Sequence, residues 1–482
     1  MVDNSTLFKI ERKDKKSIGQ GYHKNQLYYG TTVADPANYN RKLTAIVTSN
    51  RESFIAYAEH NNQITDSFGI NYSQDFCEDA IDFKWTRNSI YKWLNDDYSV
   101  DIKDVFNRLV EVNKEFMIYE DERMHKLISL DEMKTYWFQL FPANARTHFH
   151  AGPGSGKTNQ LAIYDAFAFN PIMSTDFSSA SIYRIIESTC ATILIDDFEE
   201  LEEKDRLSLL RHIKVNYKPF NTLRADGGGK DKKFTPTAYL SYSHLVFNNV
   251  LGLGGDWITS QRTITVRLLK HPGAKNKTFE QKDHKWIPLR DDLYVCGLQY
   301  FKQVMDNYYK IDGTKVGIKA RELEIVKPIL AIAKTIDEKL YEEILDLYTS
   351  MVQREKVRDL VEDFEYCLLQ RLWLDVKDKP DKEKYQIQVS SVASYIADKL
   401  SIPKKELRGL EIKIGRMLRS YTNLPSKILH GISVYTLTKE TVKTIIESKE
   451  YENYIIVNKG DVEDKGDKGN MGDEGDVNWK LD

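Results

Sequence analysis

Runs of apolar, β-branched and aromatic residues predict two strands near the start of the chain. Residues 27–33 and 43–48 are rich in β-branched and aromatic side chains, and the segment Ala-Asp-Pro-Ala-Asn at 34–38 between them favours a turn. A helical pattern follows from about residue 101. Together these segments predict an N-terminal α+β domain over residues 1–125.

Helical and strand patterns then alternate up to about residue 270. A helix over 131–141 is expected to end at Pro142, and a short strand over 147–150 leads into a glycine-rich loop. Because such alternation is typical of an α/β fold with a parallel sheet, residues 126–270 are predicted to form a core of this kind.

Three later segments differ in pattern. Residues 315–375 have the apolar spacing of helices, and residues 385–450 begin with helices and end with strands. Glycine recurs every third residue from 466 to 475 among Asp, Glu and Lys. This repeat lacks proline and is too short for a collagen helix, so a disordered acidic tail over 451–482 is favoured.

The composition restricts the class of protein. The 482 residues are enough for roughly two to four domains. The chain lacks an apolar run long enough to span a membrane, and its first residues lack the apolar core of a secretory signal. The four cysteines are far apart, which fits a reducing compartment, so a cytoplasmic protein without membrane contact is expected. With a net charge of -3, any affinity for nucleic acid must come from local basic patches.

A nucleotide-binding loop is indicated by Ala-Gly-Pro-Gly-Ser-Gly-Lys-Thr at 151–158, in which Ala151 replaces the usual first glycine. Small residues let backbone N–H groups surround phosphate oxygens, while the lysine reaches the β- and γ-phosphates and the threonine hydroxyl binds Mg²⁺. A helix follows, whose N-terminal dipole faces the phosphates. We therefore predict ATP with Mg²⁺ as the ligand, and as its binding residues Gly152, Pro153, Gly154, Ser155, Gly156, Lys157 and Thr158.

An acidic pair follows the buried-strand pattern at 191–195. A carboxylate at the end of a central strand can hold Mg²⁺, and its neighbour can polarise the attacking water. Asp196 is therefore predicted to bind the metal together with Thr158, and Asp197 to act as the base. The second acid of such a pair is usually Glu, which leaves Glu199 as a less favoured base. The alternative is a strand that simply ends in a solvated acidic turn.

Two further polar residues follow in the order expected of an ATPase. The strand pattern at 245–247 ends in Asn248, which can orient water, and Arg262 lies in Ser-Gln-Arg-Thr-Ile-Thr-Val-Arg. An Arg from a neighbouring subunit can neutralise charge in the transition state. Taken alone, an Asn after a strand is usually a turn residue and an Arg is usually a solvated charge.

The order of these motifs resembles that of the AAA+ ATPases, and within them the superfamily 3 helicase-like replication proteins of viruses and plasmids. The resemblance covers roughly residues 140–335 and rests on Gly-Pro-Gly-Ser-Gly-Lys-Thr, Ile-Leu-Ile-Asp-Asp, Phe-Asn-Asn and Ser-Gln-Arg-Thr-Ile-Thr-Val-Arg. It implies that Asn248 is a sensor, that Arg262 is a finger acting across a homohexamer interface, and that residues 271–375 form a helical lid and linker. It also makes Arg321 a candidate second sensor, with pairing to Glu324 as the alternative.

A basic loop lies between the acidic pair and the Asn248 strand. Three glycines at 227–229 can turn a hairpin, whose tip would carry Lys230, Lys232 and Lys233. Superfamily 3 helicases have a pore hairpin in this interval, and basic side chains contact the phosphates of single-stranded DNA without reading sequence. A surface loop without a nucleic-acid role is an equally weighted alternative.

The segment 376–450 resembles a winged helix, with helices predicted over 389–400 and 404–420 and strands over 428–437. The second helix has a basic face suited to a duplex DNA groove, formed by Lys413, Arg416 and Arg419. A winged helix that docks protein is the alternative.

Two histidines on the predicted strand before the loop, His148 and His150, alternate on one face without a third ligand, so packing is favoured over metal binding.

Together these features predict an α/β fold with a P-loop AAA+ parallel-sheet core, a helical lid, an N-terminal α+β domain and a C-terminal winged helix. The predicted function is an ATP-hydrolysing DNA helicase or translocase, hexameric, that acts in replication of a mobile genetic element. The competing class is a nucleotide-dependent switch or loader that binds DNA or protein without unwinding.

Overall fold

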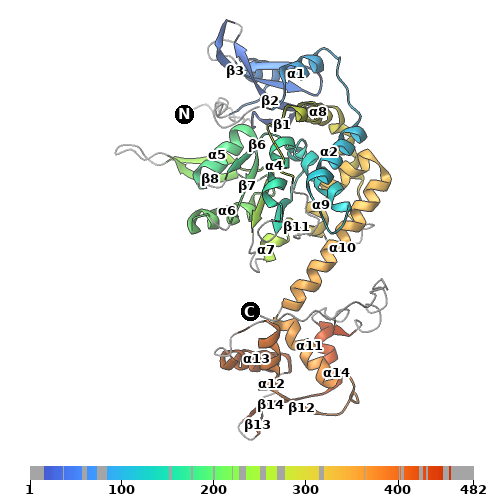
Figure 1. Cartoon of the computed structure of the whole chain (residues 1–482). Coiled ribbons are helices and arrows are strands. Elements are labelled where there is room, and N and C mark those ends of the chain that lie inside the picture. Colours follow the sequence, from blue (N-terminus) through green and yellow to red (C-terminus); the bar gives the residue numbers. More distant parts are fainter. Residues whose placement is uncertain are drawn as a thin grey trace, which may run out of the picture. The chain divides into compact units, whose positions relative to one another are not determined.

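The structure is a computed structural model of the chain, which divides into two compact units, Met1–Thr349 and Ser350–Asp482 (Figure 1). The residues that it describes are 16–35, 37–56, 62–72, 84–150, 155–174, 177, 179–198, 201–219, 221–226, 235–249, 257–268, 277–313, 318, 320–362, 364–400, 402, 407–422, 427–429, 432–448 and 455–456. The predicted acidic tail therefore lies outside the described residues except at 455–456, and the finer domain boundaries stay predictions.

An antiparallel sheet begins the first unit, and it confirms the two strands that were predicted over 27–33 and 43–48. Its strands pair in sequence order and are β1 (Gln20–His23), β2 (Gln26–Asp35), β3 (Asn38–Thr48) and β4 (Ser53–Ala56). One face packs against the π-helical turn η2 (Ile64–Phe68) through a cluster that includes Tyr28 and Ile46. Helix α1 (Arg87–Leu94) follows, and the Thr86 side chain caps it by accepting the Ser89 N–H.

Helices α2 (Ile102–Phe116) and α3 (Arg123–Lys134) come next, as the helical pattern indicated. The helix predicted over 131–141 is wrong in extent, because α3 begins earlier and a 3-10 turn, η4 (Phe138–Leu140), lies beyond it. Amide N–H groups of residues 135–137 bond to carbonyls three residues back instead of four. This tightening ends the α-helix before the aromatic run.

A five-stranded parallel sheet forms the core of the first unit and confirms the predicted α/β fold. In chain order its elements are β5 (Arg146–His150), α4 (Lys157–Phe167), β6 (Pro171–Ser174), α5 (Ser179–Thr189), β7 (Thr192–Ile195), α6 (Glu203–Val215), β10 (Leu245–Asn249), α7 (Trp257–Ser260) and β11 (Thr263–Arg267). The strand order is β11-β5-β10-β7-β6, with every pair parallel.

Helices cover both faces of this sheet, which explains why β7 and the first three residues of β10 are nearly continuous apolar runs. Ile193, Ile195 and Phe247 pack on one face in a cluster with side chains of α5 and α6. On the other face the ring of Phe149 lies 6.0 Å from that of Tyr164 in α4. Helix α4 is therefore held on the opposite side of the sheet from α5 and α6.

An antiparallel hairpin is inserted between α6 and β10. It consists of β8 (Asn221–Asp226) and β9 (Thr235–Leu240). These strands flank the predicted basic tip, but residues 227–234 themselves lie outside the described residues.

The remainder of the first unit is helical, as expected. It comprises η6 (His284–Trp286), α8 (Ile287–Lys310), α9 (Ala320–Ile336) and the start of α10 (Glu338–Glu362). Gly297 of α8 lies so close to β2 that an added Cβ would be 2.0 Å from the Tyr29 hydroxyl. Trp137 donates to the Gly297 carbonyl at 2.8 Å. The N-terminal sheet is therefore packed directly against α8 and the segment that follows α3.

The second unit contains the elements expected of a winged helix. They are α11 (Phe364–Val376), β12 (Tyr385–Gln388), α12 (Val389–Lys399), α13 (Leu407–Thr422), β13 (Lys427–Leu429), β14 (Ile432–Leu437) and α14 (Lys439–Ser448). The three strands form an antiparallel sheet in the order β12-β14-β13. One apolar core unites these elements, with Leu368, Ile396, Ile414 and Tyr435 among its buried members. The predicted helices and strands of this segment are confirmed, whereas β12 and α14 were not predicted.

Across the described parts of both units, no helix combines the length and the apolar character that crossing a membrane requires.

Candidate active site

The carboxyl edge of the parallel sheet gathers the polar residues predicted to bind ATP. Because neighbouring strands are parallel, the segments that follow β5, β7 and β10 leave the sheet at the same edge. Strand β5 is the first strand of this sheet in the chain, and later strands lie on both sides of β5. Such a switch point is where open α/β sheets bind ligands.

The start of α4 has the geometry of an anion site. Gly156 precedes the helix with φ of 89°, a left-handed conformation that strains other side chains, and Lys157 is the first helical residue. Unpaired amide groups and the helix dipole favour negative charge at such an end. Ser155 is the first described residue of the loop, whereas Gly152, Pro153 and Gly154 lie outside the described residues.

Asp196 lies between α4 and β10. It is 7% exposed, and its Oδ2 accepts the Thr158 hydroxyl at 3.2 Å. Its Oδ1 accepts the side-chain amide of Asn248 at 2.6 Å. A hydroxyl and a carboxylate in contact supply the oxygen ligands that Mg²⁺ prefers, so these residues fit the predicted metal.

Asp197 is held differently from its neighbour. Its backbone has φ of 49°, which is uncommon for a residue other than glycine, and its N–H donates to Asn248 Oδ1 at 2.8 Å. Its carboxylate is 51% exposed and lies 3.5 Å from Lys157 Nζ, whose side chain is 9% exposed. Asn248 therefore contacts both acidic residues, while the Asp197 side chain stays half-exposed beside Lys157. The alternative base Glu199 lies outside the described residues.

Arg262 lies at the opposite edge of the sheet from these residues. It directly precedes β11, whose Thr263 pairs with Arg146 at the start of β5 and whose Arg267 pairs with His150 at the end. The five-residue strand spans roughly 13 Å at about 3.3 Å per residue. The Arg262 guanidinium lies 5.0 Å from the centre of the Tyr217 ring. Arg262 is therefore remote from the site of its own chain.

The candidate second sensor, Arg321, donates to Gln261 Oε1 at 3.4 Å. Glu324, its predicted alternative partner, instead forms an ion pair with Lys218. Arg321 thus lies near the Arg262 end of the sheet.

A buried ionic network, which was not predicted from the sequence, connects the elements that carry the site. The Asp131 carboxylate accepts the hydroxyls of Thr147 at 2.6 Å and Tyr164 at 2.7 Å, and it lies 2.6 Å from Lys134 Nζ. His244, in the segment before β10, lies 3.2 Å from the same carboxylate. One side chain of α3 therefore ties together β5, α4 and the approach to β10.

Burial and neighbouring groups shift the pKa values of Asp131 and His244 in this network. Burial opposes ionisation of Asp131, but Lys134 and His244 outweigh it and hold the pKa of Asp131 well below its usual range. Burial lowers the pKa of His244 to about 4, so its ring is neutral at pH 7. In sequence, Asp131 and Lys134 look like an ordinary solvated i, i+3 pair, so periodicity gave no signal of this role.

His148 belongs to a second polar contact across the sheet. Its Nε2 lies 2.9 Å from Asn249 Oδ1, and its ring stacks on Phe247 with centroids 4.7 Å apart. Burial lowers the pKa of His148 to about 4. Within the described residues, His148 is not part of a cluster of three or more potential metal ligands.

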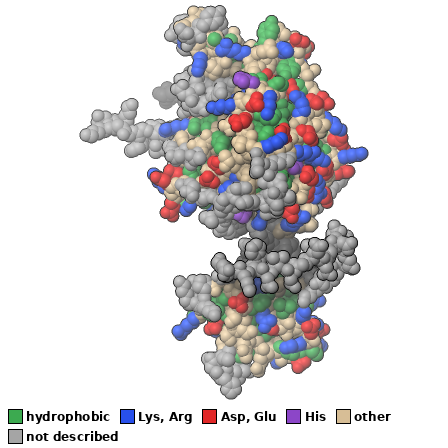
Figure 2. Space-filling model, in the orientation of Figure 1, with side chains coloured by type: hydrophobic (Ala, Val, Ile, Leu, Met, Phe, Trp, Pro, Cys, Tyr) green, Lys and Arg blue, Asp and Glu red, His purple; other side chains and the backbone are tan. Residues whose placement is uncertain are grey.

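The predicted DNA-contacting residues differ in how far the structure describes them. Lys230, Lys232 and Lys233 lie outside the described residues. On α13 the exposed cations are Arg408, Lys413, Arg416 and Arg419, which we call the basic α13 face. Arg408 was not among the predicted residues. Acidic and basic side chains are interspersed over the visible face of the first unit (Figure 2). Contact with nucleic acid would therefore depend on local surfaces such as the basic α13 face.

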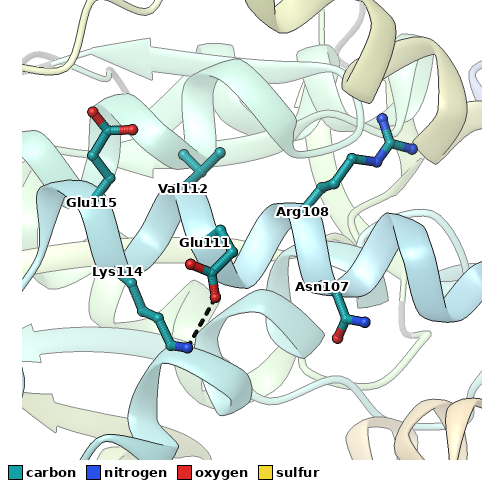
Figure 3. Close-up of a pocket in the computed structure, with 6 residues that line it drawn as sticks. All are labelled: Asn107, Arg108, Glu111, Val112, Lys114 and Glu115. Carbon is teal, nitrogen blue, oxygen red and sulfur yellow. Dashed lines mark hydrogen bonds and ion pairs between the residues drawn. The ribbon is translucent and has the colours of Figure 1, made fainter.

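A surface hollow of about 530 Å³ runs along α2 (Figure 3). Its lining side chains are Asn107, Arg108, Glu111, Val112, Lys114 and Glu115. Lys114 pairs with Glu111 at 2.9 Å, and Arg108 pairs with Asp104 at 2.9 Å. None of the predicted ATP-binding residues lines this hollow, and its other charged side chains pair with residues outside it, Arg108 also with Asp292 and Glu115 with Lys277.

Comparisons with known proteins give only distant similarity. No family model and no curated protein matches the chain. Among solved structures it is similar to an active helicase, SCCmec type IV Cch, with 11% identity and a TM-score of 0.37 over 90% of this chain and 99% of that chain. It is also similar to the apo A form of the NrS-1 C-terminal region, with 12% identity and a TM-score of 0.32 over 70% of this chain and 74% of that chain. A second apo A form of that region has 11% identity and a TM-score of 0.31 over 70% and 75% of the two chains. Similarity this low assigns neither fold nor activity, so both depend on the residues described above.

Proposed function

We propose that this chain is an ATP-hydrolysing DNA helicase or translocase. The observation that carries the proposal is the convergence of Lys157, Thr158, Asp196, Asp197 and Asn248 at one edge of the parallel sheet. A cation, a hydroxyl, two carboxylates and an amide within contact of one another match the requirements of phosphoryl transfer, which needs positioning and charge neutralisation.

Each of these residues has a role that follows from its contacts. Thr158 and Asp196 would hold Mg²⁺, which when bound neutralises charge on the β- and γ-phosphates. Lys157 would neutralise the γ-phosphate, with the backbone of residues 152–156 around the remaining phosphate oxygens. Asp197 takes the proton from the attacking water, because its side chain alone of the two acids is open to solvent. Asn248 is the positioning residue for both acids.

The placement of Arg262 supports action between subunits. A residue at the amino edge of β11 cannot reach the carboxyl edge of its own sheet, but it can complete the site of an adjacent copy. We therefore propose a closed ring in which Arg262 acts in trans. We further propose that the ring has six subunits and that it acts in replicating a mobile element. Both of these proposals rest on the resemblance to superfamily 3 proteins.

Two surfaces would contact DNA. The hairpin β8–β9 is inserted directly before β10, the strand that carries Asn248. Lys230, Lys232 and Lys233 are proposed to contact single-stranded DNA in the ring pore, and the basic α13 face to contact duplex DNA.

Strand separation on a forked duplex distinguishes this motor from the alternative switch or loader. With ATP and Mg²⁺ the wild-type chain should displace the labelled strand, whereas Lys157→Ala, or a non-hydrolysable ATP analogue, should not support displacement. Nucleotide-dependent DNA binding or assembly without displacement would instead favour the switch.

A further inference from the structure

One apolar side chain stands among the cations of the basic α13 face. Ile412 is 52% exposed, and in the described part of the second unit no other large apolar side chain is classed as exposed. Helix residues four positions apart lie on the same face, so Ile412 lies between Arg408 and Arg416. Single exposed apolar residues are common, but this one is at the centre of a charged surface.

The cations around Ile412 are available to a partner. In the described part of the chain, Arg408, Arg416 and Arg419 have no carboxylate in ion-pair contact. Lys413 lies with Nζ 3.8 Å from the centre of the Phe364 ring, which leaves its charge unneutralised. From Arg408 to Arg419 the face extends about 16 Å at 1.5 Å per residue, a length of roughly five base pairs.

Gly409 leaves room on the same face. It is exposed, it lies three residues before Ile412, and an added Cβ would meet nothing within 4 Å. The packing of the unit therefore does not require glycine here, although glycine weakens a helix relative to alanine. A flat helix surface beside an exposed aliphatic side chain suits close approach to another molecule.

We propose that α13 lies in the major groove of duplex DNA and that Ile412 contacts thymine 5-methyl groups, which makes this face sequence-reading. The inference rests on the duplex-binding role proposed above. Thymine methyl groups are displayed in the major groove and are read by apolar contact, whereas phosphate contacts position a protein without carrying sequence information. An RNA duplex lacks the methyl group, and its major groove is too narrow for side chains to read.

The test uses the full chain and two fluorescein-labelled duplexes of the same mixed sequence, one with thymine and one with uracil in its place. Anisotropy titrations at one salt concentration should show about fourfold tighter binding to the thymine duplex, the effect expected from burying one methyl group. Ile412→Ser should bring this ratio close to one, while Ile412→Val should retain it. Gly409→Ala should weaken binding to both duplexes without lowering the unfolding temperature.

Each other outcome overturns the inference in a distinguishable way. Equal wild-type affinity for the two duplexes would leave the face as a phosphate-binding surface only. A thymine preference that persists in Ile412→Ser would place the methyl contact elsewhere. Changing Lys413, Arg416 and Arg419 together to Glu should weaken binding to both duplexes. Unchanged affinity of this variant would refute the proposed duplex-binding face itself.

Discussion

On the proposed function, replacement of Asp197 by Asn should separate ATP binding from ATP hydrolysis. The substitution removes a negative charge 3.5 Å from Lys157 Nζ. It keeps the backbone N–H that donates to Asn248, and Asn tolerates the left-handed conformation at φ of 49° better than most residues. The geometry of the site should therefore survive the change, which makes Asn a sharper test than Ala.

The size of the effect follows from the exposure of the pair. Because the Asp197 side chain is 51% exposed, solvent screens its attraction to Lys157, and about 0.2–1 kcal/mol is the range for such pairs. On the proposed function, ATP would have to displace this contact in order to bind Lys157. Asp197→Asn should thus tighten ATP binding, by up to about fivefold. Hydrolysis should fall on the order of a hundredfold or more, because the amide cannot accept a proton.

Titration calorimetry with ATP and Mg²⁺, together with steady-state hydrolysis, measures the two effects separately. Glu203→Gln, an exposed carboxylate at the start of α6, is a matched control and should change neither. A loss of ATP affinity that requires Mg²⁺ would refute the reasoning. It would make Asp197 a metal ligand and move the base elsewhere, for example to Glu199.

Three further predictions concern the subunit interface, the DNA surface and stability. Arg262→Ala should bind ATP nearly normally but hydrolyse it roughly a thousandfold more slowly. Mixing this variant with Lys157→Ala should restore part of the activity, because some interfaces then pair an intact Lys157 with an intact Arg262. No rescue at any mixing ratio would contradict the ring. Changing Lys413, Arg416 and Arg419 together to Glu should weaken duplex binding without changing basal ATP hydrolysis. Anisotropy across a salt series measures the binding. Because burial lowers the pKa of His148 from about 6.5 to about 4, the unfolded chain takes up a proton first as the pH falls. The unfolding free energy should therefore be greatest above pH 6.5 and fall by about 3 kcal/mol from this group as the pH drops to 4. Thermal unfolding of His148→Asn should depend less steeply on pH in this window, and an unchanged slope would contradict the assignment.

Local patterns in the sequence were sufficient for much of the fold. The strand patterns at 27–33 and 43–48 reflect a sheet that is buried on one face. The alternation of helices and strands up to residue 270 reflects a parallel sheet that helices bury on both faces. The end of α3 could not be predicted in the same way. It depends on i, i+3 bonding by residues 135–137, for which the sequence has no separate signal.

The candidate site was only partly accessible to the same reasoning. Spacing along the chain identified Lys157, Asp196 and Asn248, because strand ends carry their functional groups to one edge. It could not reveal that Asn248 contacts both acids, since that depends on the relative placement of β7 and β10. Nor could it reveal Asp131, whose partners come from three separate elements.

The most direct test of the account is ATP hydrolysis by the full chain with Mg²⁺, measured with and without single-stranded DNA, beside Lys157→Ala. The account predicts hydrolysis by the wild-type chain that single-stranded DNA stimulates, and its loss in a Lys157→Ala variant that stays folded by circular dichroism. Near-normal turnover in the folded variant would contradict the assignment of the site at the carboxyl edge of the sheet.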